Sequence, residues 1–172
     1  MDGNGNGADG NGEYFISPSR GKRDFFQVVG DVVDFVCEDE QSRYSIVVGT
    51  DSGLNNGNGG LAEFVSVVTV HRIGKHGRYF WKKIPAVMTF NRRDRILKEA
   101  SFSLELAQRV VAELRNKLDR VPYVFEIHVD IGENGPTREM IQEIVGMIRG
   151  NGFEAKIKPY AYAANKVADR YV

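Results

Sequence analysis

Residues 44–49, YSIVVG, form an almost unbroken apolar run in which β-branched residues predominate. A run of this kind is typical of a central β-strand covered on both faces, so it requires neighbouring strands and helices on either side of a sheet. Residues 62–73 (AEFVSVVTVHRI) and 78–85 read as two further strands joined by a turn at 74–77. The chain is therefore expected to build a layered domain around a sheet.

The remaining segments complete an α/β order. Apolar residues recur at helical spacing over residues 22–37, and Asn91 can cap a helix that continues to about residue 118. Residues 123–129 and 153–158 are predicted strands, Pro136 suits the first turn of a helix that ends before residue 150, and residues 160–171 form a last helix. The order is β-β-β-α-β-α-β-α with an extra N-terminal helix. It predicts a mixed five-stranded sheet whose last two strands run parallel to the first.

Residues 1–12 are almost entirely glycine, asparagine and aspartate, and we expect a disordered Gly/Asn-rich tail over residues 1–21. Residues 22–172 should form a single domain, because 42% hydrophobic and 27% charged residues are ordinary for a globular protein. The one cysteine, Cys37, is expected to be a small buried hydrophobe. No apolar run is long enough to span a membrane and no signal peptide is recognisable, so a cytoplasmic location is expected. The sequence leaves the oligomeric state open.

Two aspartates follow strands that should lie side by side. Asp51 comes just past the first strand, in VVGTDSG, and Asp130 just past the fourth, in IHVDIG. Because parallel strands end at the same edge of a sheet, where ligand sites of open α/β sheets gather, both carboxylates should project there. Asp169 lies in the last helix, which starts from the same edge. About nine residues of helix cover only some 13 Å, so Asp169 can still face inward.

Converging carboxylates repel one another unless a cation joins them. Hard oxygen donors, with one cysteine and three histidines in the whole chain, favour Mg²⁺ or Mn²⁺ over zinc. Two such ions about 3.5–4 Å apart can activate a water and stabilise the leaving oxygen of a phosphoryl displacement. Each aspartate taken alone is also ordinary turn or helix-surface chemistry, and their joint placement is what favours a site.

These residues resemble a known family. Asn165-Lys166-Val167-Ala168-Asp169 looks like the N-x-x-A-D motif of the ribonuclease H-like superfamily, which has the same element order. The stretches IVVGTDSG, SLELAQ, EIHVDIGENG and EIVGMIRGNGFEAKIKP are similar to the YkuK-type ribonuclease H-like family, from about Asp24 to the C-terminus. The resemblance implies that acids of the first strand, first helix, fourth strand and last helix bind two metal ions. Here these are Asp51, one glutamate, Asp130 and Asp169.

The glutamate is open between Glu99 and Glu105, which lie six positions apart and so on different faces of one helix. Glu99 is about 9 Å closer to the expected edge, whereas the sequence around Glu105 resembles the superfamily's helix better. We take Glu99. His128 shares a strand face with Asp130, so it can reach the metal, pack internally or bond to the backbone. The segment KPYAYAAN lacks the histidine with which some ribonucleases H shuttle protons.

The chain carries 23 basic and 23 acidic residues, so any argument for nucleic acid must be local. Residues 72–100 hold nine basic residues against Asp94 and Glu99, a net charge of +7, with Tyr79, Phe80 and Trp81 interleaved. Such a segment suits a surface that grips phosphates and stacks bases, although it is also compatible with a solvated hairpin. The residues expected to contact nucleic acid are Arg78, Lys82, Lys83, Arg92 and Arg93.

The function favoured by these features is a metal-dependent nuclease that hydrolyses phosphodiester bonds, with RNA or an RNA–DNA hybrid as its partner. The alternative is a non-catalytic domain that keeps the fold and binds nucleic acid or protein. A third class, ATP-dependent phosphotransferases, reuses this fold, and Asp130-Ile131-Gly132 resembles their phosphate loop. Those enzymes clasp the nucleotide between two such domains, and a chain of 172 residues supplies one.

Overall fold

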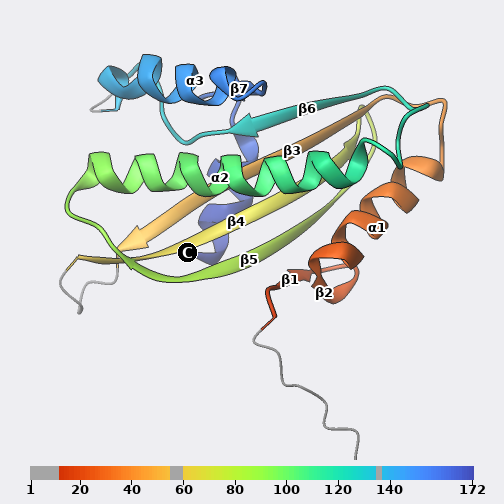
Figure 1. Cartoon of the computed structure of the whole chain (residues 1–172), viewed down its shortest axis with the longest axis horizontal. Coiled ribbons are helices and arrows are strands. Elements are labelled where there is room, and N and C mark those ends of the chain that lie inside the picture. The colour runs from red at the N-terminus through yellow and green to blue at the C-terminus, as the bar shows by residue number, and fades with distance from the viewer. Residues whose placement is uncertain (1–11, 55–59, 135–136) are drawn as a thin grey trace, which may run out of the picture.

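The computed structural model describes residues 12–54, 60–134 and 137–172, except for the side chains of residues 164 and 165. One seven-stranded sheet runs through the molecule in the order β2-β1-β5-β4-β3-β6-β7 (Figure 1). The strands are β1 (Tyr14–Ser17), β2 (Gly21–Asp24), β3 (Tyr44–Leu54), β4 (Leu61–Arg72), β5 (Gly77–Met88), β6 (Tyr123–His128) and β7 (Glu154–Lys156).

The five strands predicted from the sequence form the larger part of this sheet. Strands β3, β4 and β5 are an antiparallel meander, and β6 and β7 continue from β3 in parallel. The α/β class and the mixed sheet are therefore confirmed, with two strands more than expected. Strand β3 is longer than predicted, because its ladder with β4 continues to the pair Leu54↔Ala62.

The two extra strands come from the segment expected to be disordered. Strands β1 and β2 pair as a hairpin, and β1 joins the sheet edge where Ile16 lies opposite Trp81 of β5. The expected disorder is therefore wrong for residues 14–21, because Phe15 is fully buried and fixes β1 to the core. Residues 1–11 of the expected tail lie outside the described residues.

The helices are α1 (Phe25–Cys37), α2 (Arg92–Leu114) and α3 (Ile141–Gly150), with short turns η1 (Arg138–Met140), η2 (Ala163–Ala168) and η3 (Asp169–Tyr171). Asn91 caps α2 as predicted, because its side chain accepts from the Asp94 amide at 2.9 Å. Helix α1 begins three residues later than predicted, where Asp24 and Gln27 form a reciprocal capping box. Pro136 lies outside the described residues.

Two of the helical predictions are wrong in detail. Cys37 is exposed, because it ends α1 beside the buried stripe that runs from Phe25 to Val36. The last helix is shorter than residues 160–171: a turn in which the Tyr160 amide donates to the Ile157 carbonyl precedes it. It then runs as a π-helix over η2 and tightens to a 3₁₀ turn over η3.

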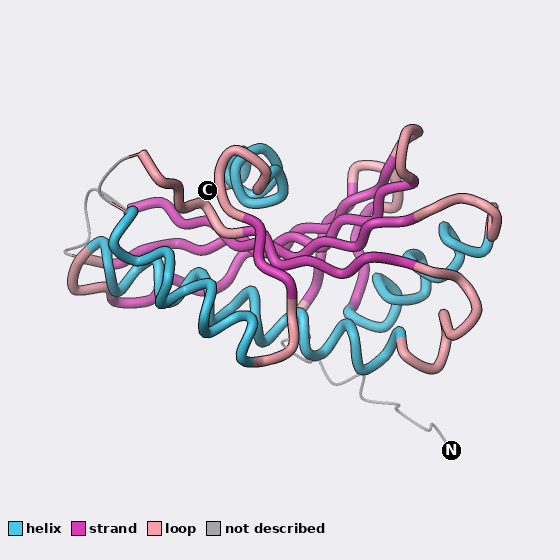
Figure 2. Tube along the Cα trace, turned by 90° about the horizontal axis from the view of Figure 1, so that it is seen from above, coloured by secondary structure: helices cyan, strands magenta, loops and turns pink. Residues whose placement is uncertain are grey.

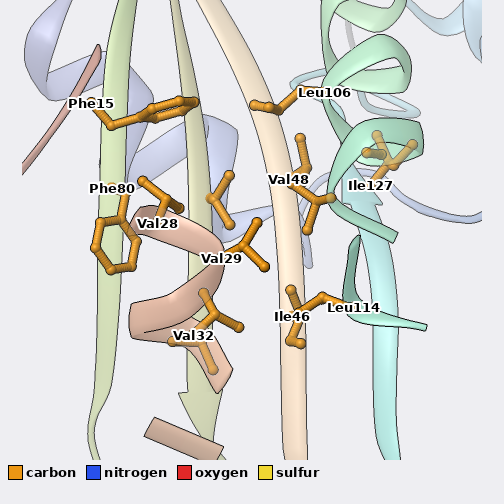
Figure 3. Close-up of a cluster of buried hydrophobic side chains, with 14 of the residues drawn as sticks. Phe15, Val28, Val29, Val32, Ile46, Val48, Phe80, Leu106, Leu114 and Ile127 are labelled. Atoms are coloured by element: carbon orange, nitrogen blue, oxygen red, sulfur yellow. The ribbon is translucent and has the colours of Figure 1, made fainter. Parts of the chain in front are cut away.

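The core separates the two faces of the sheet. Helices α1, α2 and α3 cover one face, and the C-terminal segment crosses the other (Figure 2). On the helical face, side chains of α1, α2, the central strands and β1 interlock, as Figure 3 shows for Val29, Val48, Phe80 and Leu106. Within the described ranges, none of the helices is both long and apolar enough to cross a membrane.

Candidate active site

The parallel pair β3–β6 brings Asp51 and Asp130 to the same level. The last residues paired between these strands are Gly49 and His128, and each aspartate lies two residues further along. Asp130 follows the end of β6, as predicted, whereas Asp51 lies inside β3 opposite Val65 of β4. The register of the sheet therefore supplies the juxtaposition that the sequence predicted.

Asp51 and Ser52 point to opposite faces of β3, because side chains alternate along a strand. The Ser52 hydroxyl contacts α2 on the helical face, so Asp51 belongs to the face of the C-terminal segment. Its Oδ1 accepts from the Ser52 amide at 2.9 Å. Burial raises the pKa of Asp51 to about 6, and the negative charges of Asp130 and Asp169 add to the rise.

Glu99 is the acid that α2 buries. Its side chain is only 4% exposed and accepts a short hydrogen bond from the Ser52 hydroxyl. Burial raises the pKa of Glu99 to about 8, opposed by this hydrogen bond and reinforced by the charges of Asp51 and Asp130. Glu105 is exposed and faces elsewhere on α2, whereas Glu99 is the glutamate whose pKa the charge of Asp51 raises.

Asp130 has a cation of its own. Lys158, two residues beyond the end of β7, places its Nζ 3.0 Å from Asp130 Oδ1. The Asp130 carboxylate is about a quarter exposed, and its Oδ1 atom is buried without a hydrogen-bond geometry. The contact with Lys158 is therefore best described as an ion pair whose charges meet at the rim of the site.

Asp169 lies at the start of η3 and is exposed. Its charge nevertheless contributes to the raised pKa of Asp51, which places it within electrostatic reach of that carboxylate. Asn165, the first residue of the motif, lies in η2, and its side chain is outside the described part of the structure.

Asp51 lies within electrostatic reach of Glu99, Asp130 and Asp169, but the four acids do not form a metal-ligand cluster. In the part of the chain that the structure describes, no three His, Cys, Asp or Glu side chains are grouped so that they could hold a metal ion. Local partners explain this: Ser52 engages Glu99, Lys158 engages Asp130, and Asp169 is exposed. The donor chemistry still fits Mg²⁺ or Mn²⁺, because the groups are oxygen atoms and their charges raise one another's pKa values.

His128 is a packing residue of the fold. It is buried, its Nδ1 accepts from the Ala163 amide at 3.3 Å, and its Nε2 lies 3.2 Å from Glu126 Oε2. These contacts fix the neutral tautomer with the proton on Nε2. The ring is therefore used to dock the start of η2 on β6, the internal role that the sequence left open.

The sequence interpretation missed three polar neighbours of the acids. Ser52 was passed over as turn chemistry, and Lys158 as the end of a strand, although the carboxyl end of β7 reaches the same edge as β6. Arg95 lies one helical turn before Glu99, the spacing of interacting side chains on a helix. Its charge lowers the pKa of both Asp51 and Glu99, and its Nε is buried without a partner among the described residues. The acids thus have two basic neighbours, Lys158 and Arg95, which the sequence pattern did not indicate.

The basic segment is largely neutralised by acids from other elements. Arg78 pairs with Glu38 at 2.9 Å, and Lys82 pairs with Glu13. Lys83 lies 3.5 Å from Glu63, and Arg93 lies 2.5 Å from Glu143, both as exposed pairs. Arg92 is exposed and has no ion pair among the residues described.

The aromatic residues of that segment are structural. Phe80 is fully buried, Trp81 stacks on Tyr171 with ring centroids 4.2 Å apart, and Tyr79 shares a hydrogen bond with the Tyr171 hydroxyl. They fasten the C-terminal segment to β5. Phe90, just before α2, is 86% exposed, and Lys98 Nζ lies 6.0 Å from the centroid of its ring.

Comparisons with known proteins agree with this architecture. Residues 27–172 match the family model described as ribonuclease H-like. A protein of Bacillus subtilis (strain 168), described as the uncharacterized protein YkuK, is 32% identical over 168 residues, which cover 91% of this chain and 95% of the relative. No solved structure matches the chain.

Proposed function

The chain belongs to the ribonuclease H-like family, in its YkuK-type branch, and from that premise we propose that it is a metal-dependent nuclease acting on RNA or on the RNA of a hybrid. One observation carries the proposal. Burial raises the pKa of both Asp51 and Glu99, the charge of Asp51 adds to the rise at Glu99, and neither acid has an ion pair within the described ranges. An acid pair held under such repulsion favours binding of a hard divalent cation.

In this proposal, Asp51, Glu99, Asp130 and Asp169 would hold Mg²⁺ or Mn²⁺. When bound, the metal supplies Lewis-acid stabilisation of phosphate oxygens and lowers the pKa of water. The protein's own contribution is positional: Ser52 orients the Glu99 carboxylate, and the β3–β6 register sets Asp51 beside Asp130. Arg95 adds a positive charge close to where an anionic phosphate would approach.

The nucleic acid would be gripped at the start of α2. Phe90, Arg92 and Arg93 are exposed in succession around the cap residue Asn91, and Lys83 is more than half exposed on β5. Exposed arginines contact phosphates, and an exposed ring stacks a base. Arg78 and Lys82 are only 17% and 14% exposed and already paired, so they contribute less.

The alternative is a domain that binds nucleic acid or protein without cleaving it. The ion pair between Lys158 and Asp130 favours it, because a neutralised acid attracts a cation less strongly. The absence of a three-ligand group in the described residues points the same way.

A cleavage assay with Mg²⁺ or Mn²⁺ on single-stranded RNA, duplex RNA, hybrid and DNA tests the proposal. We expect wild type to cut an RNA-containing substrate, and Asp51→Asn to lower the rate at least about 1,000-fold while leaving binding within about threefold. Glu105→Gln is the control, because Glu105 is an exposed acid on the same helix as Glu99, and it should match wild type. Tight RNA binding by wild type without cleavage of any substrate would favour the non-catalytic alternative.

A further inference from the structure

We propose that Lys158 is a fixed cationic partner of Asp130, so that this site binds one divalent cation in place of the two expected from the sequence. The inference rests on the proposed function, since it concerns how the same acids take up metal. It assigns a role to a residue that neither the motif nor the acid pattern identifies.

The contact is a close ion pair. Lys158 Nζ lies 3.0 Å from Asp130 Oδ1, and that oxygen atom is fully shielded from solvent. A shielded oxygen attracts a neighbouring cation more strongly than an exposed one, because water screens it less. Lys158 therefore neutralises the Asp130 oxygen that is shielded from solvent.

The backbone holds Lys158 in this place. The Val129 amide donates to the Lys156 carbonyl at 2.9 Å, and the Lys158 amide donates to the Ile131 carbonyl at 2.8 Å. These two hydrogen bonds bracket Asp130 and continue the parallel pairing of β6 and β7 past the end of both strands. The backbone of Lys158 is thus part of the sheet's framework, which fixes the point from which its half-exposed side chain reaches Asp130.

Gly132 makes room for the aliphatic part of Lys158. A Cβ atom at residue 132 would lie 3.1 Å from Lys158 Cβ and 3.6 Å from Lys158 Cδ. The 3.1 Å approach is tighter than most Cβ contacts and the 3.6 Å one is ordinary van der Waals contact, so the stem of the lysine packs along the bare backbone of the glycine. The stem is directed along this backbone toward Asp130.

The formal charges of the fully ionised site agree with one metal ion. The carboxylates of Asp51, Glu99, Asp130 and Asp169 carry a formal charge of −4 when all are ionised. Lys158 and the neighbouring Arg95 supply +2 and leave −2, the charge that one divalent cation neutralises. Because Asp130 already has its partner, the cation is expected on the Asp51 and Glu99 side of the edge.

Counting bound Mn²⁺ tests the inference without reference to activity. Free Mn²⁺ is followed by electron paramagnetic resonance as the full-length chain is titrated. We compare wild type with Lys158→Gln, which removes the charge, and with Lys158→Arg, which keeps it. Lys156→Gln is the matched control, because Lys156 ends β7 two residues before Lys158, is similarly exposed and pairs with Glu126 at 3.7 Å.

We expect one Mn²⁺ per chain for wild type, Lys158→Arg and Lys156→Gln. Lys158→Gln should bind a second ion, or bind the first at least about tenfold more tightly, because the repulsion from the ammonium is gone. Two ions on wild type, or a Lys158→Gln titration identical to that of Lys156→Gln, would overturn the inference. Wild type that binds one Mn²⁺ in the expected pattern but cuts no RNA would contradict only the proposed nuclease. A wild type and Lys158→Gln that both bind no Mn²⁺ would contradict both proposals.

Discussion

Glu13 contacts helix α2 and Glu99 lies within it, and the two carboxylates have opposite electrostatic surroundings. Glu13 receives both arms of the Arg109 guanidinium, at 3.0 and 2.6 Å, and also pairs with Lys82. Glu99 lies some ten residues before Arg109 on α2. It accepts a hydrogen bond from the Ser52 hydroxyl and is exposed to the negative charges of Asp51 and Asp130. The hydrogen bonds from Arg109 hold the pKa of Glu13 near 2, whereas burial raises the pKa of Glu99 to about 8.

Ionised Glu13 therefore stabilises the fold, whereas ionised Glu99 destabilises it. Glu13 fastens the segment before β1 to α2 and β5, and its charge is matched by two cations. Glu99 costs folding free energy whenever it is ionised without a counter-ion. A protein keeps such a group where something else supplies the missing charge, which is why the Asp51–Glu99 edge is the candidate site.

Removing the charge of Glu13 should give the largest change in stability. Glu13→Gln leaves Lys82 and Arg109 without their partner, and Lys82 is only 14% exposed. Because Glu13 is itself partly exposed, we expect a loss of about 2 kcal/mol, or roughly 4–8 °C in melting temperature, at pH 7. The native pKa of Glu13 lies below its ordinary value of 4.5, so this stabilisation is present above pH 4.5 and is lost as the pH falls toward 2.

Thermal melts of Glu13→Gln and Glu143→Gln check the prediction, because Glu143 pairs with Arg93 on the open surface. The control should change by less than about 0.5 kcal/mol. Equal losses in the two variants would mean that Glu13 is an ordinary surface acid and that the comparison with Glu99 fails.

Glu99→Gln should act in the opposite direction and depend on pH. The native pKa of Glu99 is raised from 4.5 to about 8, so the folded state binds more protons than the unfolded state in that interval. Stability of the metal-free wild type should therefore fall as pH rises from about 4.5 to 8. Glutamine still accepts the Ser52 hydroxyl and carries no charge. We expect Glu99→Gln to gain about 1–2 kcal/mol relative to wild type at pH 9 and nothing at pH 4.5.

Metal-free melts at several pH values measure this difference, with Glu105→Gln as an exposed control on the same helix. A variant less stable than wild type at pH 9 would show that Glu99 stabilises the fold as Glu13 does. In that case the electrostatic surroundings of Glu99 would no longer support cation binding at the acidic edge.

The sequence predicts the sheet well because periodicity and order determine it. The five strands, the α2 cap at Asn91 and the parallel pairing of β6 with β3 follow from local pattern and chain order. The hairpin β1–β2 was missed because GEYFIS adjoins a glycine-rich tract and holds only four strand residues. Its partner is residue Trp81 of β5, far away in the chain, which no local pattern shows.

The candidate site was predictable only in part. Chain order brings Asp51 and Asp130 together, and distance along α2 selects Glu99 over Glu105. The counter-charges were not foreseen, because the pairs Lys158–Asp130 and Lys82–Glu13 join residues 28 and 69 positions apart. The +7 count over residues 72–100 overstated the positive surface for the same reason.

The smallest expected effect concerns RNA binding by the exposed arginines at the start of α2. If the start of α2 is the grip, Arg92→Ala with Arg93→Ala should weaken RNA binding about tenfold at moderate salt, because two phosphate contacts are lost. The slope of log K against log salt should become shallower by about 1.5, since each contact to a single strand releases about 0.7 of a counterion. Lys82→Ala, by contrast, should leave the slope unchanged and lower the melting temperature, because Lys82 is engaged with Glu13 beside the paired Arg109. Salt-titrated fluorescence anisotropy on a short RNA measures both variants. A slope change with Lys82→Ala and none with the double variant would mean that the nucleic acid binds at β5 and not at the start of α2. Glu13 would then compete with the nucleic acid for Lys82, and its main role would not be structural.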